Sequence, residues 1–257
     1  MSEPATTVRL IPSDPPELVV HDAPSPCSYL PGRTARLPLR LPLRPLDHAA
    51  FEQRLGQGDR RQGRLLYRTS CPGCQACEPI RIDVARFRPS QSQRRAHKKG
   101  LLAIRTELGP LELSERRVAL YDRHKVGRGL GGEDGATSPE TYRAFLVDTC
   151  TDSFELRYSV GDELIGVAVT DRAERSLSAV YCYYDPAHEA LSPGVFSILQ
   201  QLELCRRWGL EWLYLGLYVA ECSHMSYKAR YLPHERLVAG SWQRFEGRPS
   251  PRTTTPP

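Results

Sequence analysis

Three cysteines lie close together in the sequence and could bind a metal. The segment Cys71-Pro-Gly-Cys74-Gln-Ala-Cys77 places a thiol at every third position. A tight Pro-Gly turn can bring two thiolates to one tetrahedral ion, and sulfur ligands suit zinc or an iron–sulfur cluster. Cys27 could supply a fourth ligand from a distant loop. Because the second Cys-x-x-Cys half of a zinc ribbon is missing, a turn with unligated thiols remains the alternative.

The segment 87–100 is the most cationic stretch of the chain, and we expect it to bind a substrate. Its basic side chains are Arg88, Arg94, Arg95, Lys98 and Lys99. Ser90 and Ser92 add hydroxyl groups that suit phosphate or ribose oxygens. Basic clusters of this kind are also common as plain solvated surface, which is the alternative interpretation.

The charge of the chain is unevenly distributed. The 257 residues include 35 basic and 30 acidic side chains, for a net charge of +5. Residues 1–110 hold 18 basic and 10 acidic groups, a net +8, whereas residues 111–257 hold 17 and 20, a net −3. A basic first half on a near-neutral second half indicates a polyanionic partner such as RNA.

The sequence predicts neither a membrane span nor a secretory signal. Its longest uninterrupted apolar run, residues 213–220, has eight residues, whereas a membrane-spanning helix needs about 20. The first residues, Met-Ser-Glu-Pro, are not followed by an apolar segment. We therefore expect a cytoplasmic protein with no membrane partner, in which cysteines stay reduced.

The first half of the chain predicts a small cysteine-containing module. Residues 1–26 are rich in proline and lack periodicity, which indicates a flexible lead-in. Asp47 is a suitable N-cap for a short helix over 48–55. Strands are expected at 65–67 and 80–84, forming a hairpin around the cysteine turn. The expected domains are this module over 27–110, a second domain over 111–247, and a disordered tail over 248–257.

The second half predicts a mixed helix and strand domain. The expected elements are helices 115–126, 139–149 and 193–208, and strands 154–160, 164–170, 177–184 and 212–217. Hairpin, strand, helix and strand in this order are typical of the N-acyltransferase (GNAT-like) fold, so the expected fold class is α/β (α+β). A CoA-dependent acetyltransferase would carry a glycine-rich loop before the last helix, but residues 191–195, Leu-Ser-Pro-Gly-Val, hold one glycine and no basic residue.

Several segments, taken in chain order, resemble the aminoacyl-tRNA–protein transferase (arginyl/leucyl-transferase) family, and within it the bacterial aspartate/glutamate leucyltransferase branch. The resemblance covers about residues 21–245. The matching segments are Cys27-Ser-Tyr-Leu, Tyr67-x3-Cys71-x2-Cys74-x-Ala-Cys77-x-Pro-Ile-Arg81-Ile, Phe87-x-Pro-Ser90-x-Ser92-Gln-Arg94-Arg95, Gly166-Val-Ala-Val-Thr-Asp171, Leu177-Ser-Ala-Val-Tyr-x-Tyr-Tyr-Asp-Pro186, Trp212-Leu-Tyr-Leu-Gly216 and Cys222-x2-Met225-x-Tyr-Lys228. One departure is Arg128-Gly129, where the branch pattern has Arg-His; if that histidine is catalytic, this chain uses another group, such as His124.

The resemblance implies an enzyme that transfers leucine from leucyl-tRNA, its co-substrate, to the α-amine of proteins that begin with Asp or Glu. The added leucine marks those proteins for degradation in the N-degron pathway. The implied partners are aminoacyl-tRNA and these acceptor proteins, with no DNA and no CoA. Three alternatives stay open: an arginyl-tRNA-dependent transferase, a CoA-dependent N-acetyltransferase, and a metal-stabilised RNA-binding module.

The chemistry of this reaction narrows the candidate site. An α-amine attacks an already activated ester, so the site must align both substrates, remove a proton and stabilise an oxyanion. In this fold such a site lies where the two central strands, here 178–185 and 212–217, diverge. Tyr181, Tyr183 and Asp185 are therefore the catalytic candidates, although alternate tyrosines could simply face the core.

The remaining substrate-binding candidates come from the matching segments. Tyr227 and Lys228 could contact RNA phosphate or the acceptor. The carboxylate of an acceptor's Asp or Glu calls for a cationic partner, for which Arg81, Arg94 and Lys228 are the candidates.

Overall fold

The structure is a computed structural model that describes residues 9–129 and 135–247. Its helices are α1 (His48–Gly56), α2 (Gln91–Ala103), α3 (Glu115–Gly127), α4 (Pro139–Tyr142) with the π-turn η1 (Arg143–Val147), the 3-10 turn η2 (Pro186–Leu191), α5 (Pro193–Arg207), α6 (Ser223–Ser226) and the 3-10 turn η3 (Tyr227–Arg230). Its strands are β1 (Arg9–Ile11), β2 (Glu17–His21), β3 (Pro24–Pro26), β4 (Thr34–Arg36), β5 (Leu39–Pro42), β6 (Arg60–Gln62), β7 (Leu65–Tyr67), β8 (Glu78–Asp83), β9 (Arg105–Gly109), β10 (Ser153–Val160), β11 (Glu163–Arg172), β12 (Ser176–Tyr184), β13 (Trp212–Tyr218), β14 (His234–Val238) and β15 (Ser241–Phe245).

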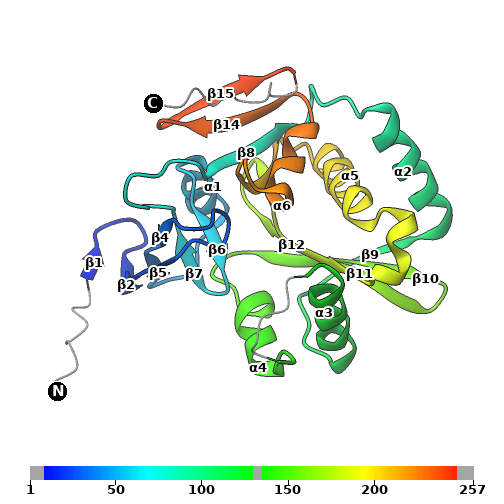
Figure 1. Ribbon diagram of the computed structural model, residues 1–257, viewed down its shortest axis with the longest axis horizontal. Helices are drawn as coiled ribbons and strands as arrows, with labels where there is room; N and C mark the ends of the chain where they lie inside the picture. Colours follow the sequence, from blue (N-terminus) through cyan, green and yellow to red (C-terminus); the bar gives the residue numbers. More distant parts are fainter. Residues whose placement is uncertain (1–8, 130–134, 248–257) are drawn as a thin grey trace.

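An eight-stranded sheet forms the centre of the molecule, in the order β15-β14-β8-β13-β12-β11-β10-β9. Figure 1 shows α2 and α5 on one side of this sheet and α3 and α4 on the other. β12 and β13 are parallel neighbours joined through α5, and the other pairs in this sheet are antiparallel. The expected mixed fold with an antiparallel-rich sheet over 154–217 is confirmed.

Local signals in the sequence account for the helix boundaries. Asp47 accepts a hydrogen bond from the Ala50 N–H (2.8 Å) and so begins α1. Ser90 and Gln93 form a reciprocal capping box at the start of α2. Gly209 has a φ of +68°, which glycine adopts freely, directly after the end of α5.

Two apolar clusters hold the helices against the large sheet. One joins Phe154, Leu156 and Tyr158 of β10 to α5 residues that include Phe196 and Leu202. The other, on the opposite face, packs α3 and α4 against β11 and β12. β11 is buried on both faces, which agrees with its apolar sequence and central position.

A five-stranded sheet, in the order β1-β2-β5-β7-β6, packs beside the large sheet. Residues 9–26, within the predicted flexible lead-in, are instead part of the folded structure as β1, β2 and β3. Ionic contacts help to hold this segment in place. The fully buried Glu17 carboxylate accepts a hydrogen bond from Nη1 of Arg40 (2.8 Å) and forms an ion pair with Nε of Arg54 (2.8 Å).

The predicted hairpin around the cysteine turn is wrong. β7 belongs to the five-stranded sheet and pairs with β5 and β6, whereas β8 lies in the large sheet between β13 and β14. β9 also lies in the large sheet. The predicted division at residue 110 therefore cuts through that sheet, and the predicted tail, 248–257, lies outside the described residues.

Candidate functional site

The two central parallel strands stay paired for only a short distance. β12 pairs with β13 at Ser176↔Trp212, Leu177↔Leu213 and Ser178↔Tyr214, and the pairing stops there although both strands continue. Because the strands are parallel, their C-terminal ends diverge at the same edge of the sheet. Backbone groups along both open edges then need other partners, since a buried unpaired carbonyl costs about 1–3 kcal/mol.

Arg60 of β6 fills the start of this gap. Its guanidinium donates to the Ala179 carbonyl (3.1 Å) and to Oγ of Ser178 (3.3 Å), both on β12. On the β13 side, a Cβ at Gly216 would lie 3.0 Å from Nη2 of Arg60, and Gly216 has a φ of +84°. Glycine therefore suits this position on two counts, the left-handed backbone and the close approach of the arginine.

Lys228 of η3 satisfies the open edge of the other strand. Its Nζ donates to the Leu217 carbonyl of β13 (2.7 Å), and the residue is only 7 % exposed. Burial lowers the pKa of Lys228 to about 7, Arg60 lowers it further, and the thiols of Cys222 and Cys77 oppose the shift. Lys228 is thus a buried amine that holds the backbone, and its contact with RNA phosphate or the acceptor stays a prediction that this geometry does not favour.

His124 of α3 occupies the far end of the β12 edge. Its Nδ1 lies 3.1 Å from the Tyr184 nitrogen and 3.0 Å from the Tyr184 carbonyl oxygen, so one tautomer accepts and the other donates there. Burial lowers the pKa of His124, although the hydrogen bond to the carbonyl opposes that shift. His124 is therefore a neutral backbone partner, which does not favour it as a substitute for the histidine missing at Gly129.

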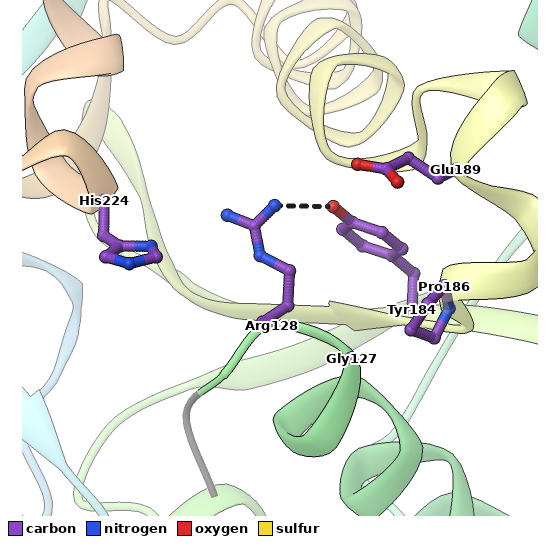
Figure 2. Close-up of a pocket in the computed structure, with 6 residues that line it drawn as sticks. All are labelled: Gly127, Arg128, Tyr184, Pro186, Glu189 and His224. Atoms are coloured by element: carbon purple, nitrogen blue, oxygen red, sulfur yellow. Dashed lines mark hydrogen bonds between the residues drawn. The ribbon is translucent and has the colours of Figure 1, made fainter.

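A pocket opens where the two diverging strands end. Its volume is about 190 Å³, and Figure 2 shows Arg128 pointing into it between His224 and Tyr184. The lining residues are Gly127, Arg128, Tyr184, Pro186, Glu189 and His224. Tyr184 is the last residue of β12, Pro186 is the first residue of η2, and His224 lies on α6, which comes soon after β13. The absence of a side chain on Gly127 lets the end of α3 approach the Pro186 ring, and this places Arg128 at the pocket.

Of the three predicted catalytic residues, none lines this pocket. Tyr183 is fully buried and shares a hydrogen bond with the Tyr142 hydroxyl, and Tyr181 packs against Tyr121 on the same face of β12. Burial would raise the pKa of Asp185, but hydrogen bonds from the Ala187 N–H (3.0 Å) and Arg123 (2.7 Å) outweigh it and leave that pKa below its usual value. A catalytic role for these residues stays a prediction that the geometry does not favour.

Arg81 is fully occupied within the fold. Its guanidinium donates to Glu235 (2.7 Å) and lies between the Trp212 and Trp242 rings, 3.8 Å and 4.2 Å from their centroids. It also donates to the Tyr214 hydroxyl (3.0 Å). An arginine that is already paired with a carboxylate and stacked between two rings is poorly placed to bind the carboxylate of a substrate.

The cationic segment forms α2, whose side chains are not among those that line the pocket, although Lys99 donates to the Ala190 carbonyl of η2 (2.8 Å). Ser90 caps the helix and its hydroxyl lies 3.0 Å from that of Ser92, while Arg94 donates to the Pro89 carbonyl (2.5 Å). Arg94 and Arg95 are exposed, as are Lys98 and Lys99, so this helix offers a positive surface to solvent. That arrangement suits a polyanion better than a single carboxylate.

Tyr227 lies near the pocket. The protein atoms packed around its phenol raise the pKa of Tyr227 to about 12, although 38 % of the residue is exposed, and Cys182, Arg128 and Tyr184 have smaller effects. Its neighbours therefore include two of the residues that line the pocket. A binding role for Tyr227 is compatible with this position.

The predicted metal ligands gather without forming a finished metal site. Burial raises the pKa of Cys77 to about 12, and the thiols of Cys71, Cys27 and Cys74 add to that shift. However, the Cys71 sulfur accepts the Arg36 N–H (3.4 Å). Within residues 9–129 and 135–247, only Glu163, Asp185 and His188 bring three candidate ligand atoms within 4.8 Å of one another. The four thiols as placed do not fit one tetrahedral ion, and metal binding by them stays a prediction.

Sequence reasoning missed the residues that shape the site. Arg60 lies on β6, in a basic segment that showed no motif, and Glu189 and His224 lie on η2 and α6, short helical segments outside the elements that the sequence predicted. Arg128 had one signal, because it precedes the position where the leucyltransferase branch pattern has histidine.

Comparison with known proteins identifies the family. A family model described as the N terminus of arginine-tRNA-protein transferase matches residues 25–95, and one described as its C terminus matches residues 116–238. An aspartate/glutamate leucyltransferase of Thiobacillus denitrificans is 41 % identical over 220 residues, which cover 86 % of this chain and 91 % of the relative. One of Aeromonas hydrophila is 40 % identical over 229 residues, 87 % of this chain and 93 % of the relative. The chain belongs to this transferase family.

Two solved structures share a distant likeness with the transferase. The C-terminal domain of a putative lysylphosphatidylglycerol synthetase from Agrobacterium fabrum has a TM-score of 0.43 and 13 % identity, covering 61 % of this chain and 49 % of that one. FemX has a TM-score of 0.43 and 7 % identity, covering 65 % and 59 %. Among the described residues of the transferase, no helix has the length and apolar character required to cross a bilayer.

Proposed function

We infer that this transferase moves leucine from leucyl-tRNA to the N-terminal α-amine of proteins that begin with Asp or Glu. The observation that carries the inference is the 41 % identity to an aspartate/glutamate leucyltransferase over 91 % of that relative's length. Such a reaction marks the acceptor for degradation in the N-degron pathway. Because its donor is a charged tRNA, we also propose a cytoplasmic location.

The reaction asks the protein for positioning and proton handling. The acceptor ammonium first loses one proton to solvent, and the neutral amine then attacks the ester carbonyl. The C–N bond forms as the ester C–O bond breaks, the nitrogen loses a second proton, and the 3′ oxygen of the tRNA gains one. The ester is already activated, so the protein needs no covalent intermediate.

The geometry supports this reaction in two places. The pocket at the diverging strand ends has room and charge for one end of an acceptor chain. The exposed cations of α2 offer a surface for tRNA phosphates. α2 packs on α5, because Gly100 lets the Phe196 ring approach its backbone, and α5 begins close to the pocket, directly after η2.

A direct assay tests the proposal. The purified protein is incubated with leucyl-tRNA labelled on leucine and with peptides that begin with Asp, Glu, Asn or Ala. We expect label to move to the Asp and Glu peptides much faster than to the Asn and Ala peptides. Absence of transfer to any peptide would contradict the proposal.

Arginine as the transferred residue is the second candidate, because the matching family models are described by arginine-tRNA-protein transferase. A parallel reaction with arginyl-tRNA separates the two. Transfer from arginyl-tRNA alone would keep the family and replace the donor.

A further inference from the structure

We propose that Arg128 and Glu189 together bind the N-terminal residue of the acceptor, with Arg128 pairing with its side-chain carboxylate and Glu189 with its α-amine. The proposal rests on the proposed function for the identity of the acceptor. Its evidence is the charge and shape of the pocket, and it names the residues that select an acidic first residue.

The pocket carries opposite charges within reach of one small ligand. Arg128 and Glu189 both line it, and Figure 2 shows the Tyr184 hydroxyl between their side chains. Arg128 lies 3.5 Å from that hydroxyl, and both charges influence the pKa of Tyr184 in opposite directions. An N-terminal Asp or Glu presents a carboxylate and an amine only a few bonds apart, which is the complementary arrangement.

Both charged groups are available. In the described part of the chain, neither Arg128 nor Glu189 forms a salt bridge, and both are exposed. Arg123, one turn earlier on α3, is instead paired with Asp185 (2.7 Å). A guanidinium next to a neutral hydroxyl and facing a pocket is the arrangement that a carboxylate ligand would complete.

The other cations near the site have other partners. Arg81 pairs with Glu235, Lys228 donates to the Leu217 carbonyl, and Arg60 donates to the Ala179 carbonyl. His224 lies on the opposite side of Arg128 and can add a second hydrogen bond to the carboxylate. Arg128 is thus the best placed of these cations to decide acceptor choice.

The location also suits the reaction. The pocket lies at the C-terminal ends of the diverging strands, beside Tyr227 and near the open edge of β12. An amine held by Glu189 would therefore face the gap where the aminoacyl ester must approach. Binding the acceptor's first residue at this point fixes its amine before the tRNA arrives.

The first test is a double-mutant cycle, in which one change is made at Arg128 of the protein and the other in the first side chain of the acceptor peptide. Steady-state transfer is measured at saturating leucyl-tRNA with peptides that begin with Asp or with its neutral analogue Asn. A charge-assisted hydrogen bond is worth a factor of roughly 10 to 150 in affinity. We expect Arg128→Gln to reduce the preference for Asp over Asn by about that factor through KM, and Arg128→Lys to restore part of it.

The matched control is Arg116→Gln, on the helix that ends just before Arg128, because Arg116 donates to the Asp162 carbonyl, and neither residue lines the pocket. It should leave the Asp preference unchanged. An equal loss for Asp and Asn peptides in Arg128→Gln would overturn the proposal, as would no loss at all. Failure of the wild-type protein to use any acidic peptide would instead refute the proposed function.

The second test addresses Glu189 through binding alone. Anisotropy compares an Asp peptide with its N-acetylated form, which lacks the positive charge. We expect the wild-type protein to prefer the free amine by roughly tenfold or more, and Glu189→Gln to abolish that preference. If Glu189→Gln keeps the preference, the amine is bound elsewhere and that part of the proposal is wrong.

Discussion

Replacing Lys228 by methionine should change how the stability of the protein depends on pH. Lys228 is 7 % exposed, and its pKa in the folded protein is lowered from 10.5 to about 7, mainly by burial. At pH values between these two pKa values, Lys228 is protonated in the unfolded chain and neutral in the folded protein. The lysine therefore destabilises the folded state fully at and below about pH 7, and this cost falls as the pH rises from there toward 10.5.

The size of the effect follows from the shift. One bound proton changes the free energy of unfolding by up to ~1.4 kcal/mol per pH unit. Lys228 should therefore contribute a rise of about 2 kcal/mol between pH 7.5 and pH 9. Lys228→Met also leaves the Leu217 carbonyl without its 2.7 Å donor, which costs about 1–3 kcal/mol at every pH. The pH-dependent part is the diagnostic quantity, because the missing hydrogen bond only shifts the whole curve.

Urea denaturation at a series of pH values measures this difference. The free energy of unfolding of the wild type minus that of Lys228→Met should be about 2 kcal/mol larger at pH 9 than at pH 7.5. The exposed Lys98 provides the control, since Lys98→Met should run parallel to the wild type. Parallel curves for Lys228→Met would show that its amine is solvated, and a direct role in binding RNA or the acceptor would then regain support.

Three further predictions concern the other basic residues. Replacing Arg94, Arg95, Lys98 and Lys99 together by alanine should weaken leucyl-tRNA binding. The slope of log K against log salt concentration should become less steep by up to ~0.9 for each phosphate that these side chains no longer neutralise. An unchanged slope in filter binding would place the tRNA elsewhere. Arg60→Met removes the donor to the Ala179 carbonyl and the Ser178 hydroxyl, so the free energy of unfolding should fall by about 1–3 kcal/mol per group and the rate of transfer should fall as well. A fully active, equally stable variant would contradict the role of Arg60 in the gap. Arg81→Met removes one of the two arginine partners of Glu235, the other being Arg244, and should lower the midpoint of thermal unfolding, while KM for Asp peptides stays the same. A selective rise in that KM would return Arg81 to the acceptor site.

The sequence predicted the part of the fold that local signals control. β10 and β12 follow from alternating apolar residues and β11 from a continuous apolar run, while α5 follows from Pro193 at its first position and Gly209 after its end. The hairpin around the cysteines failed because strand pairing is decided by distant segments: β8 joins β13, more than a hundred residues later. α2 was missed because it is polar on nearly every side, with only Gln93 and Gly100 buried.

The candidate site, like the fold, was predicted only in part from the sequence. Sequence pattern identified β12 and its tyrosines, but alternation alone does not say which face meets the substrate. Tyr181 and Tyr183 face the cluster with α3 and α4, whereas Tyr184 faces the pocket. Packing on both sides of the sheet decides this, and no feature within β12 itself encodes it.

The gap between β12 and β13 explains why so many basic residues near the site serve structure. Strands that part in a buried sheet leave carbonyls that only donors can satisfy, and this chain supplies them from Arg60 and Lys228, with His124 at the Tyr184 backbone. The donors that these side chains use on the backbone are not available to a substrate. The groups left for recognition are those beyond the strand ends, where Arg128 and Glu189 face the pocket without ion pairs among the residues described. The open sheet edge and the location of acceptor recognition are thus two consequences of the same divergence of strands.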